Sequence, residues 1–264
     1  MYLNQNKLEY LPEHLSNLVN LEILEIKHNL LTEVPNFIKN LINLNYLNLS
    51  YNKINFIYSY IDTLTKIEEL NLSFNEIQYL PNSINKLQNL ISIDLSCNKL
   101  IEFPNNCERL FKLKKLFLSN NSIMNIDNIC EIKSLEEISL NGNQIFEVPD
   151  IINNLENLVY LNLSENNISN LPNTFNKCKK LHQLYLSNNF ITDITNICKI
   201  KTLESLSLYN NQIFDIPNTI FNLENLIYLN LSENCISNLP KTIIYCTQLK
   251  ELNLSKNRNK PNTF

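Results

Sequence analysis

Histidine and cysteine are the side chains of this 264-residue sequence with the widest chemical range, because both serve as metal ligands and catalytic groups. The three histidines, His14, His28 and His182, are too widely spaced to form a cluster. The seven cysteines form no CxxC pair and have no zinc-like spacing with a histidine. They are Cys97, Cys107, Cys130, Cys178, Cys198, Cys235 and Cys246. We therefore expect no metal site, no catalytic residue and no cofactor.

The cysteines themselves indicate two environments. Cys107, Cys178 and Cys246 occupy otherwise apolar registers of the repeating pattern described below, which favours small buried side chains. Cys97 and Cys235 lie among polar residues, so we expect them to be more exposed. A nucleophilic cysteine needs a histidine or a cation beside it, and Cys97 has only Lys99 nearby. With no export signal, free thiols and a cytoplasmic location are the better interpretation.

The composition excludes several classes of function. Gly142 is the only glycine, whereas phosphate-binding loops and dinucleotide motifs need several. A net charge of −4 argues against nucleic acid, which is bound by basic surfaces. No stretch of about 18 apolar residues predicts a membrane span. We expect neither a small-molecule substrate nor a membrane or nucleic-acid partner.

One asparagine recurs throughout the chain at intervals of 23 residues, or twice of 22. Leucine, or a similar apolar residue, lies five and three positions before it, and another apolar residue lies two positions after it. The unit is LxxLxLxxNxIxxLPxxIxxLxx, as in Leu158–Lys180. The recurring asparagines are Asn6, Asn29, Asn52, Asn75, Asn98, Asn121, Asn143, Asn166, Asn189, Asn211, Asn234 and Asn257. Repeats of this length predict a solenoid, in which each unit is stable only when stacked on its neighbours.

This unit resembles the leucine-rich repeat in its 23-residue, LPxxI form. The resemblance covers residues 1–257, with about ten full repeats and a partial one at each end, and leaves residues 258–264 as a polar tail. It implies one α/β domain, a right-handed, curved horseshoe solenoid. A parallel sheet would line its concave face, and short 3₁₀, helical or irregular segments its convex face.

Local physical chemistry agrees with this expectation. LxL alternates with a period of two, so Leu161 and Leu163 point to one side of a strand and Asn162 to the other. Prolines six positions after most of the asparagines fix φ where the chain leaves the strand. The side-chain amide of asparagine both donates and accepts, so a stacked column of asparagines can bridge successive turns.

A longer period accompanies the repeat. The third, sixth and ninth units have Tyr58, Asp127 and Thr195 in place of proline, and residues 113–180 match 181–248 at 42 of 68 positions. A block of three repeats was therefore duplicated. The two 22-residue units resemble those of protein phosphatase 1 regulatory subunits, whereas the LPxxI majority resembles intracellular Ras-pathway scaffolds.

Eight aromatic residues fall on registers of the predicted concave face that have no packing role inside a coil. Aromatic side chains on an open, rigid surface are enriched at protein–protein hot spots. The alternative is an AT-rich genome, whose codons favour Tyr and Phe everywhere. The candidate partner-binding residues are Tyr46, Tyr51, Phe74, Phe117, Tyr160, Tyr185, Tyr209 and Tyr228.

We expect a cytoplasmic, non-catalytic scaffold or adaptor that binds a protein partner on its concave face. Two alternatives stay open. One is a regulatory subunit of a phosphatase or small-GTPase complex, as the resembling families suggest. The other is the substrate-targeting fragment of a larger enzyme.

Overall fold

A computed structural model describes residues 1–257, and the predicted tail at 258–264 lies outside the described residues. The chain forms two compact units, which we treat separately. Unit 1 comprises Met1–Ile123 and Glu131–Leu135, and unit 2 comprises Met124–Cys130 and the chain from Glu136 onward. The single domain expected over residues 1–257 stays a prediction.

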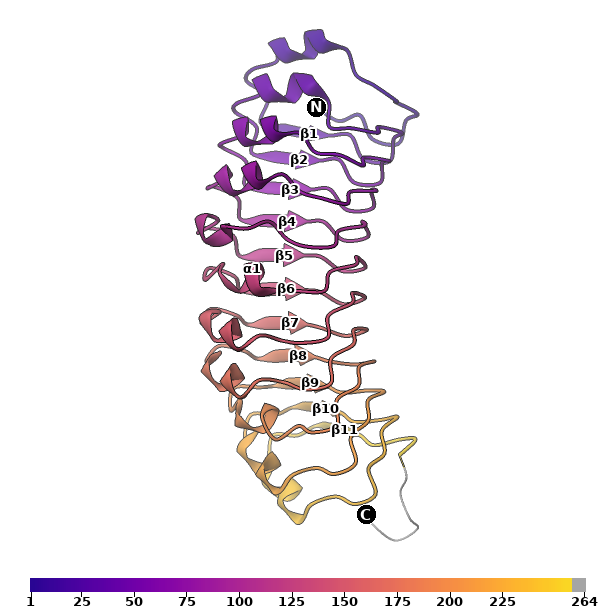
Figure 1. Cartoon of the computed structure of the whole chain (residues 1–264), viewed down its shortest axis with the longest axis vertical. Coiled ribbons are helices and arrows are strands. Elements are labelled where there is room, and N and C mark those ends of the chain that lie inside the picture. Colours follow the sequence, from indigo (N-terminus) through magenta and orange to yellow (C-terminus); the bar gives the residue numbers. More distant parts are fainter. Residues whose placement is uncertain (258–264) are drawn as a thin grey trace. The chain divides into compact units, whose positions relative to one another are not determined.

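Unit 1 contains five short parallel strands, each paired with the next in sequence (Figure 1). They are β1 (Ile23–Glu25), β2 (Tyr46–Asn48), β3 (Glu69–Asn71), β4 (Ser92–Asp94) and β5 (Lys115–Phe117). Tyr2 adds an isolated parallel bridge to Glu25, which is the contribution of the first coil. The 3₁₀ segments between strands are η1 (Glu13–Asn17), η2 (Asn36–Asn40), η3 (Ser59–Thr63), η4 (Asn82–Lys86) and η5 (Cys107–Arg109).

Unit 2 repeats the arrangement with six parallel strands in sequence order (Figure 1). They are β6 (Glu137–Ser139), β7 (Tyr160–Asn162), β8 (Gln183–Tyr185), β9 (Ser205–Ser207), β10 (Tyr228–Asn230) and β11 (Glu251–Asn253). The other segments are α1 (Asp127–Cys130), η6 (Asp150–Asn154), η7 (Asn173–Lys177), η8 (Ile197–Lys199), η9 (Asn218–Asn222) and η10 (Lys241–Tyr245).

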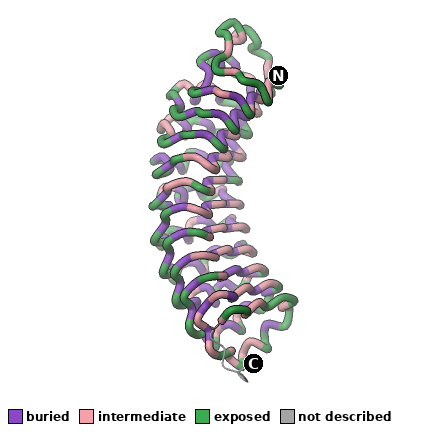
Figure 2. The backbone as a smooth tube through the Cα atoms, turned by 90° about the vertical axis from the view of Figure 1, so that its right-hand side faces the viewer, coloured by how far each residue is buried: buried purple, intermediate pink, exposed green. Residues whose placement is uncertain are grey.

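The repeat's apolar positions make the core of each unit. Leu161 and Leu163 have no exposed surface. Asn162, which lies between them, and Tyr160, which precedes them, are half-buried. More and less buried residues alternate in a similar way on most strands of both units (Figure 2), whereas no residue of β11 in the last coil is buried. We call the sheet surface opposite this core the open face. Burying several leucines per coil stabilises the stack, at about 1.5–3 kcal/mol for each side chain.

Proline fixes where most 3₁₀ segments begin. Seven of them follow a proline with φ between −60° and −72°, and Pro172 before η7 is typical. Pro104 is the exception, because Asn106, two residues later, precedes η5 with a left-handed φ of 59°. The two 22-residue units differ as well: one carries the α-helical turn α1 and the other the short η8.

The recurring asparagines bridge neighbouring coils. Asn166 Nδ2 donates to Leu140 O of the preceding coil and to Leu163 O of its own coil, both at 3.0 Å. Its Oδ1 accepts from Ile145 N at 3.0 Å. The same pattern recurs at the other asparagines, for example at Asn52 and Asn234. Asn6 differs, because it is exposed and bonds only to carbonyls of its own coil.

The residue before each asparagine turns the chain through the left-handed region. In all twelve coils its φ lies between 51° and 68°, although only Gly142 is a glycine. The other eleven are Gln5, His28, Tyr51, Phe74, Cys97, Asn120, Glu165, Asn188, Asn210, Glu233 and Lys256. A Cβ makes this conformation cost roughly 1–2 kcal/mol, so the surrounding backbone hydrogen bonds must hold it.

Candidate functional site

Five of the eight candidate aromatic residues lie on strands, with their side chains on the open face. They are Tyr46, Phe117, Tyr160, Tyr185 and Tyr228, and all are half-buried. Tyr46, Tyr160 and Tyr228 occupy the first strand position, whereas Phe117 and Tyr185 occupy the third. The open face of each unit therefore carries rings that the core does not enclose.

The strand tyrosines of unit 2 form a small polar and aromatic cluster. The rings of Tyr160 and Tyr185 lie 5.5 Å apart and are tilted by 46°. The Tyr185 hydroxyl donates to Gln183 Oε1 at 3.3 Å and accepts from Ser205 Oγ at 3.4 Å. Burial raises the pKa of Tyr160 above its ordinary value, so its hydroxyl stays protonated at neutral pH. Both rings thus offer an apolar surface next to hydrogen-bonding groups.

The remaining three candidates lie in the turns after the strands. Tyr51 and Phe74 occupy the left-handed position before Asn52 and Asn75, and they are 41% and 42% exposed. Tyr209 lies one position earlier in its coil, and its hydroxyl donates to Glu233 Oε2 at 3.0 Å. This bond to a carboxylate raises the pKa of Tyr209. The structure thus divides the candidates between strands and turns.

Consecutive turns of unit 1 stack their rings. His28 and Tyr51 lie face to face with centroids 4.1 Å apart, and Tyr51 and Phe74 have the same separation. This column of stacked rings was not predicted from the sequence. Its signal was the 23-residue spacing of the three aromatic residues, each immediately before a recurring asparagine.

Many of the most exposed aromatic residues lie on neither the strands nor these turns. They follow the recurring asparagine by one to four positions, on what we call the flank, and Phe146 is 60% exposed there. They are not among the residues predicted from the sequence, because they lie outside the concave registers. Other large apolar side chains of the flank are Tyr10, Phe56, Tyr79, Ile101, Met124, Phe190 and Phe214.

A second asparagine register, also missed, has a structural explanation. Asn43 Nδ2 donates to Val19 O at 2.9 Å, and Asn89 Nδ2 donates to Thr65 O at 2.8 Å. Lysines of the next coil then bond to the amide oxygens, as Lys66 does to Asn43 at 2.6 Å. These bonds link coils on the side of the 3₁₀ segments, so this register contributes to stability.

The groups with the widest chemistry lie apart from one another. His182, immediately before β8, pairs with Glu204, immediately before β9, at 3.1 Å. All seven cysteines are free thiols, and five of them are buried. Burial raises the pKa of Cys107 to about 12, which keeps it a thiol at neutral pH. Within residues 1–257, no three histidine, cysteine or acidic side chains are grouped as metal ligands. No described helix is long and apolar enough to cross a membrane.

Models of leucine-rich repeats match the chain in successive blocks. The general leucine rich repeat model matches residues 20–77 and 201–258, and the two-copy leucine rich repeat model matches residues 156–199. Residues 56–155 match the repeats of leucine-rich repeat and WD repeat-containing protein 1. No curated protein sequence matches the chain significantly.

Solved structures support the same class. A leucine-rich repeat protein of Leptospira interrogans is 34% identical with a TM-score of 0.94, covering 98% of this chain and 67% of its own. An internalin of Listeria monocytogenes is 26% identical with a TM-score of 0.87, covering 99% and 75%. The plant peptide hormone receptor RGFR1, in complex with RGF2, shares the fold at 23% identity and a TM-score of 0.61, covering 97% and 55%.

The chain therefore belongs to the leucine-rich repeat family. The predicted fold class, a leucine-rich-repeat solenoid with a parallel sheet and mostly 3₁₀ segments, is confirmed. This fold commonly mediates protein–protein interaction, because stacked coils present an extended, regular surface.

Proposed function

We propose that this protein is a non-catalytic scaffold that binds a protein partner through the open face of its sheet. The observation that carries the proposal is the Tyr160–Tyr185 cluster, which places two half-exposed rings and several hydroxyl groups on a rigid strand surface. Tyrosine on such a surface supplies contact area with little loss of conformational entropy on binding.

The surrounding side chains fit a partner with both apolar and polar groups. Tyr228 lies level with Ser205 and Glu251 on the neighbouring strands, and Tyr160 lies level with Gln183. Small polar residues beside rings leave room for a partner's side chains and can bond to its backbone. This mixture is typical of interface cores surrounded by polar residues.

The test is a pull-down from lysate of the source cells with two matched triple variants. The open-face variant is Tyr160→Ala, Tyr185→Ala and Tyr228→Ala. The control removes three exposed side chains from the 3₁₀ segments of the same unit, which we call its helical side. These changes are Ile151→Ala, Phe221→Ala and Tyr245→Ala. Both must melt like the wild type. We expect the partner to be lost from the open-face variant and retained by the control.

Retention of the partner by the open-face variant would contradict the assignment of this surface. Loss from the control alone would move the binding site to the helical side. Recovery of no protein by the wild type would favour codon bias as the explanation of the strand tyrosines.

A cytoplasmic location is part of the same proposal. Seven free thiols, five of them in the core, support a reducing compartment, because oxidising compartments favour disulfides. Fractionation of the source cells with an antibody to the protein tests this location. Recovery in the secreted or surface fraction would overturn it.

A further inference from the structure

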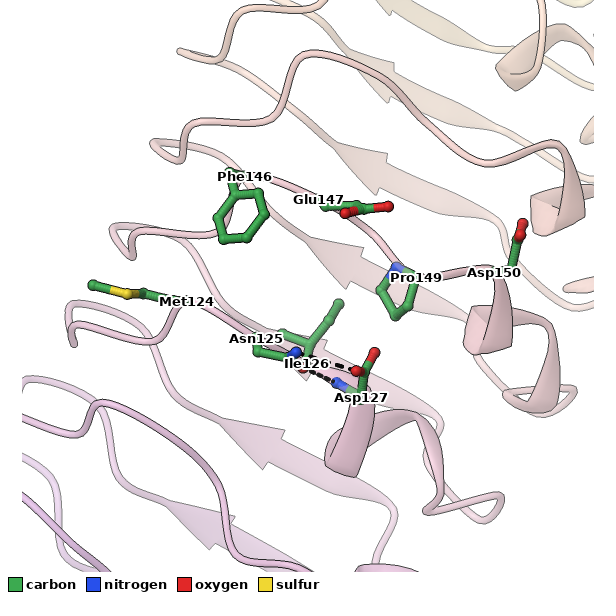
Figure 3. Close-up of a pocket in the computed structure, with 8 residues that line it drawn as sticks. All are labelled: Met124, Asn125, Ile126, Asp127, Phe146, Glu147, Pro149 and Asp150. Atoms are coloured by element: carbon green, nitrogen blue, oxygen red, sulfur yellow. Dashed lines mark hydrogen bonds between the residues drawn. The ribbon is translucent and has the colours of Figure 1, made fainter.

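The flank of unit 2 contains a hollow of about 230 Å³ between two successive coils (Figure 3). One segment contributes Met124 and Asp127, and the next contributes Phe146, Glu147 and Asp150. Met124 and Phe146 lie at one end of the hollow, and the two aspartates lie at the other (Figure 3). A second hollow of similar volume shares Glu147 and Asp150 and continues to the next coil, so the surface extends beyond one pocket.

The apolar end of this hollow is unusually open to solvent. Phe146 is 60% exposed and Met124 is 51% exposed. Phe190 and Phe214 of the following coils are 48% and 51% exposed on the same flank. Exposed apolar side chains on one flank favour contact with a partner, because burying them removes apolar surface from water.

Two of the three carboxylates accept hydrogen bonds from neutral side chains. Asp127 Oδ2 accepts from Asn125 Nδ2 at 3.1 Å, and Asp150 Oδ1 accepts from Thr174 Oγ1 at 3.3 Å. Among residues 1–257, neither these two nor Glu147 forms an ion pair. Other carboxylates of the chain do have a cation, as Asp62 has Lys86 at 2.7 Å. The negative charge of the hollow therefore has no counterpart within the described chain.

We propose that this hollow binds an arginine side chain of a protein partner. The proposal goes beyond the scaffold function above, because the site lies on the flank and takes a charged group. A guanidinium forms paired hydrogen bonds with carboxylates, which the acidic end of the hollow offers, and the aliphatic part of the same side chain can pack along Met124 and Phe146 at the apolar end. The net charge of −4 adds a long-range attraction for a basic segment.

The probe is the peptide acetyl-Gly-Arg-Gly-amide, with its citrulline analogue as the neutral control. The chain has two methionines, so methyl-¹³C-methionine labelling gives one signal in the hollow, Met124, and one reference, Met1. The variant Met124→Leu assigns the two signals. We expect the arginine peptide to shift the Met124 signal saturably and leave Met1 unchanged, with weaker binding as salt is added.

Two charge-matched variants test the carboxylates. The site variant is Asp127→Asn, Glu147→Gln and Asp150→Asn, in which every side chain keeps an acceptor oxygen. The control is Glu108→Gln, Glu156→Gln and Glu224→Gln, which removes exposed carboxylates outside the hollow. Removing three negative charges takes the net charge from −4 to −1 in both. We expect the site variant to bind the peptide about tenfold more weakly and the control to bind within about twofold of the wild type.

Several results would overturn the proposal. They are no shift of Met124, an equal shift with the citrulline peptide, or unchanged affinity in the site variant. Equal affinity for the lysine analogue would overturn the assignment to arginine. None of these variants alters the open face, so failure here leaves the scaffold proposal standing, and failure of the open-face test leaves this one standing.

Discussion

Two adjacent positions in each coil show opposite kinds of constraint. The position of the recurring asparagine, which we call the ladder position, holds asparagine in all twelve coils. The position before it, which we call the turn position, holds nine different residue types. Both follow the strand and both are needed to turn the chain into the core. At the ladder position the side chain completes backbone hydrogen bonds of two coils, as Asn166 does. At the position before it, only the left-handed φ is common to all coils.

The comparison separates what a repeat requires from what it permits. Buried N–H and C=O groups need partners, and only an amide of this length both donates and accepts there. The turn position constrains the backbone alone, so its side chains are free to interact along the solenoid. They do so as pairs or short columns within each unit, such as His28 with Tyr51 and Asn188 with Asn210.

The largest expected effect is the loss of a buried ladder amide. Asn166→Ala leaves three carbonyls and the Ile145 N–H without their side-chain partner, which should lower the free energy of unfolding by about 1–3 kcal/mol. Asn6→Ala is the control, because Asn6 is exposed and bridges no coils. Chemical denaturation measures both. Equal losses in the two variants would show that the amide bonds are not the cause.

The second effect tests the backbone requirement of the turn position. Gly142 has a φ of 68°, and Gly142→Val places a β-branched side chain there, so we expect a loss of about 1–2 kcal/mol. Gly142→Asn should cost much less, because asparagine already occupies this position at Asn120, Asn188 and Asn210. Thermal melts of the two variants give the difference. A valine variant as stable as the asparagine variant would remove the conformational explanation.

The third effect concerns side chains that the turn position permits. Tyr51 stacks on both His28 and Phe74, so Tyr51→Ala should cost about 1 kcal/mol through lost ring contacts. Tyr51→Phe keeps the rings and should melt close to the wild type. If both variants melt like the wild type, the column adds nothing to stability, and its rings are available for binding alone.

The same contrast explains what the sequence could predict. The LxL pattern and the asparagine spacing located the strands and the ladder, because period-two alternation holds through a strand. This alternation does not continue through the left-handed residue, and for this reason Tyr51 and Phe74 lie in turns rather than on the strands. Glycine usually indicates a left-handed turn in a sequence, but only one of these twelve turns has a glycine, and eleven other residues adopt the same conformation. The flank hollow depends on how two coils lie together, which no one repeat encodes.

The smallest effect concerns a charged pair of the turn position. Glu233 Oε1 bonds to Lys256 Nζ of the next coil, and Oε2 accepts from the Tyr209 hydroxyl. The lysine bond is the main cause that lowers the pKa of Glu233 below its ordinary value of 4.5, and the tyrosine bond adds to it. Because the folded pKa is the lower one, the pair stabilises the fold fully above pH 4.5. The contribution is lost as the pH falls through the folded pKa.

Lys256→Met should therefore move the pKa of Glu233 back toward 4.5, as followed by NMR titration of its side-chain carboxyl carbon. Lys250→Met removes the same charge from an exposed lysine with no bond to Glu233 and serves as the control. An unchanged Glu233 pKa in Lys256→Met would mean that the pair does not form in solution. Because Lys256 is exposed and Glu233 is only partly buried, added salt should shrink the difference between the two variants. The repeat tolerates such a salt-sensitive pair but does not require it. Its removal should therefore leave the neighbouring hydrogen bonds of the Asn234 side chain in place.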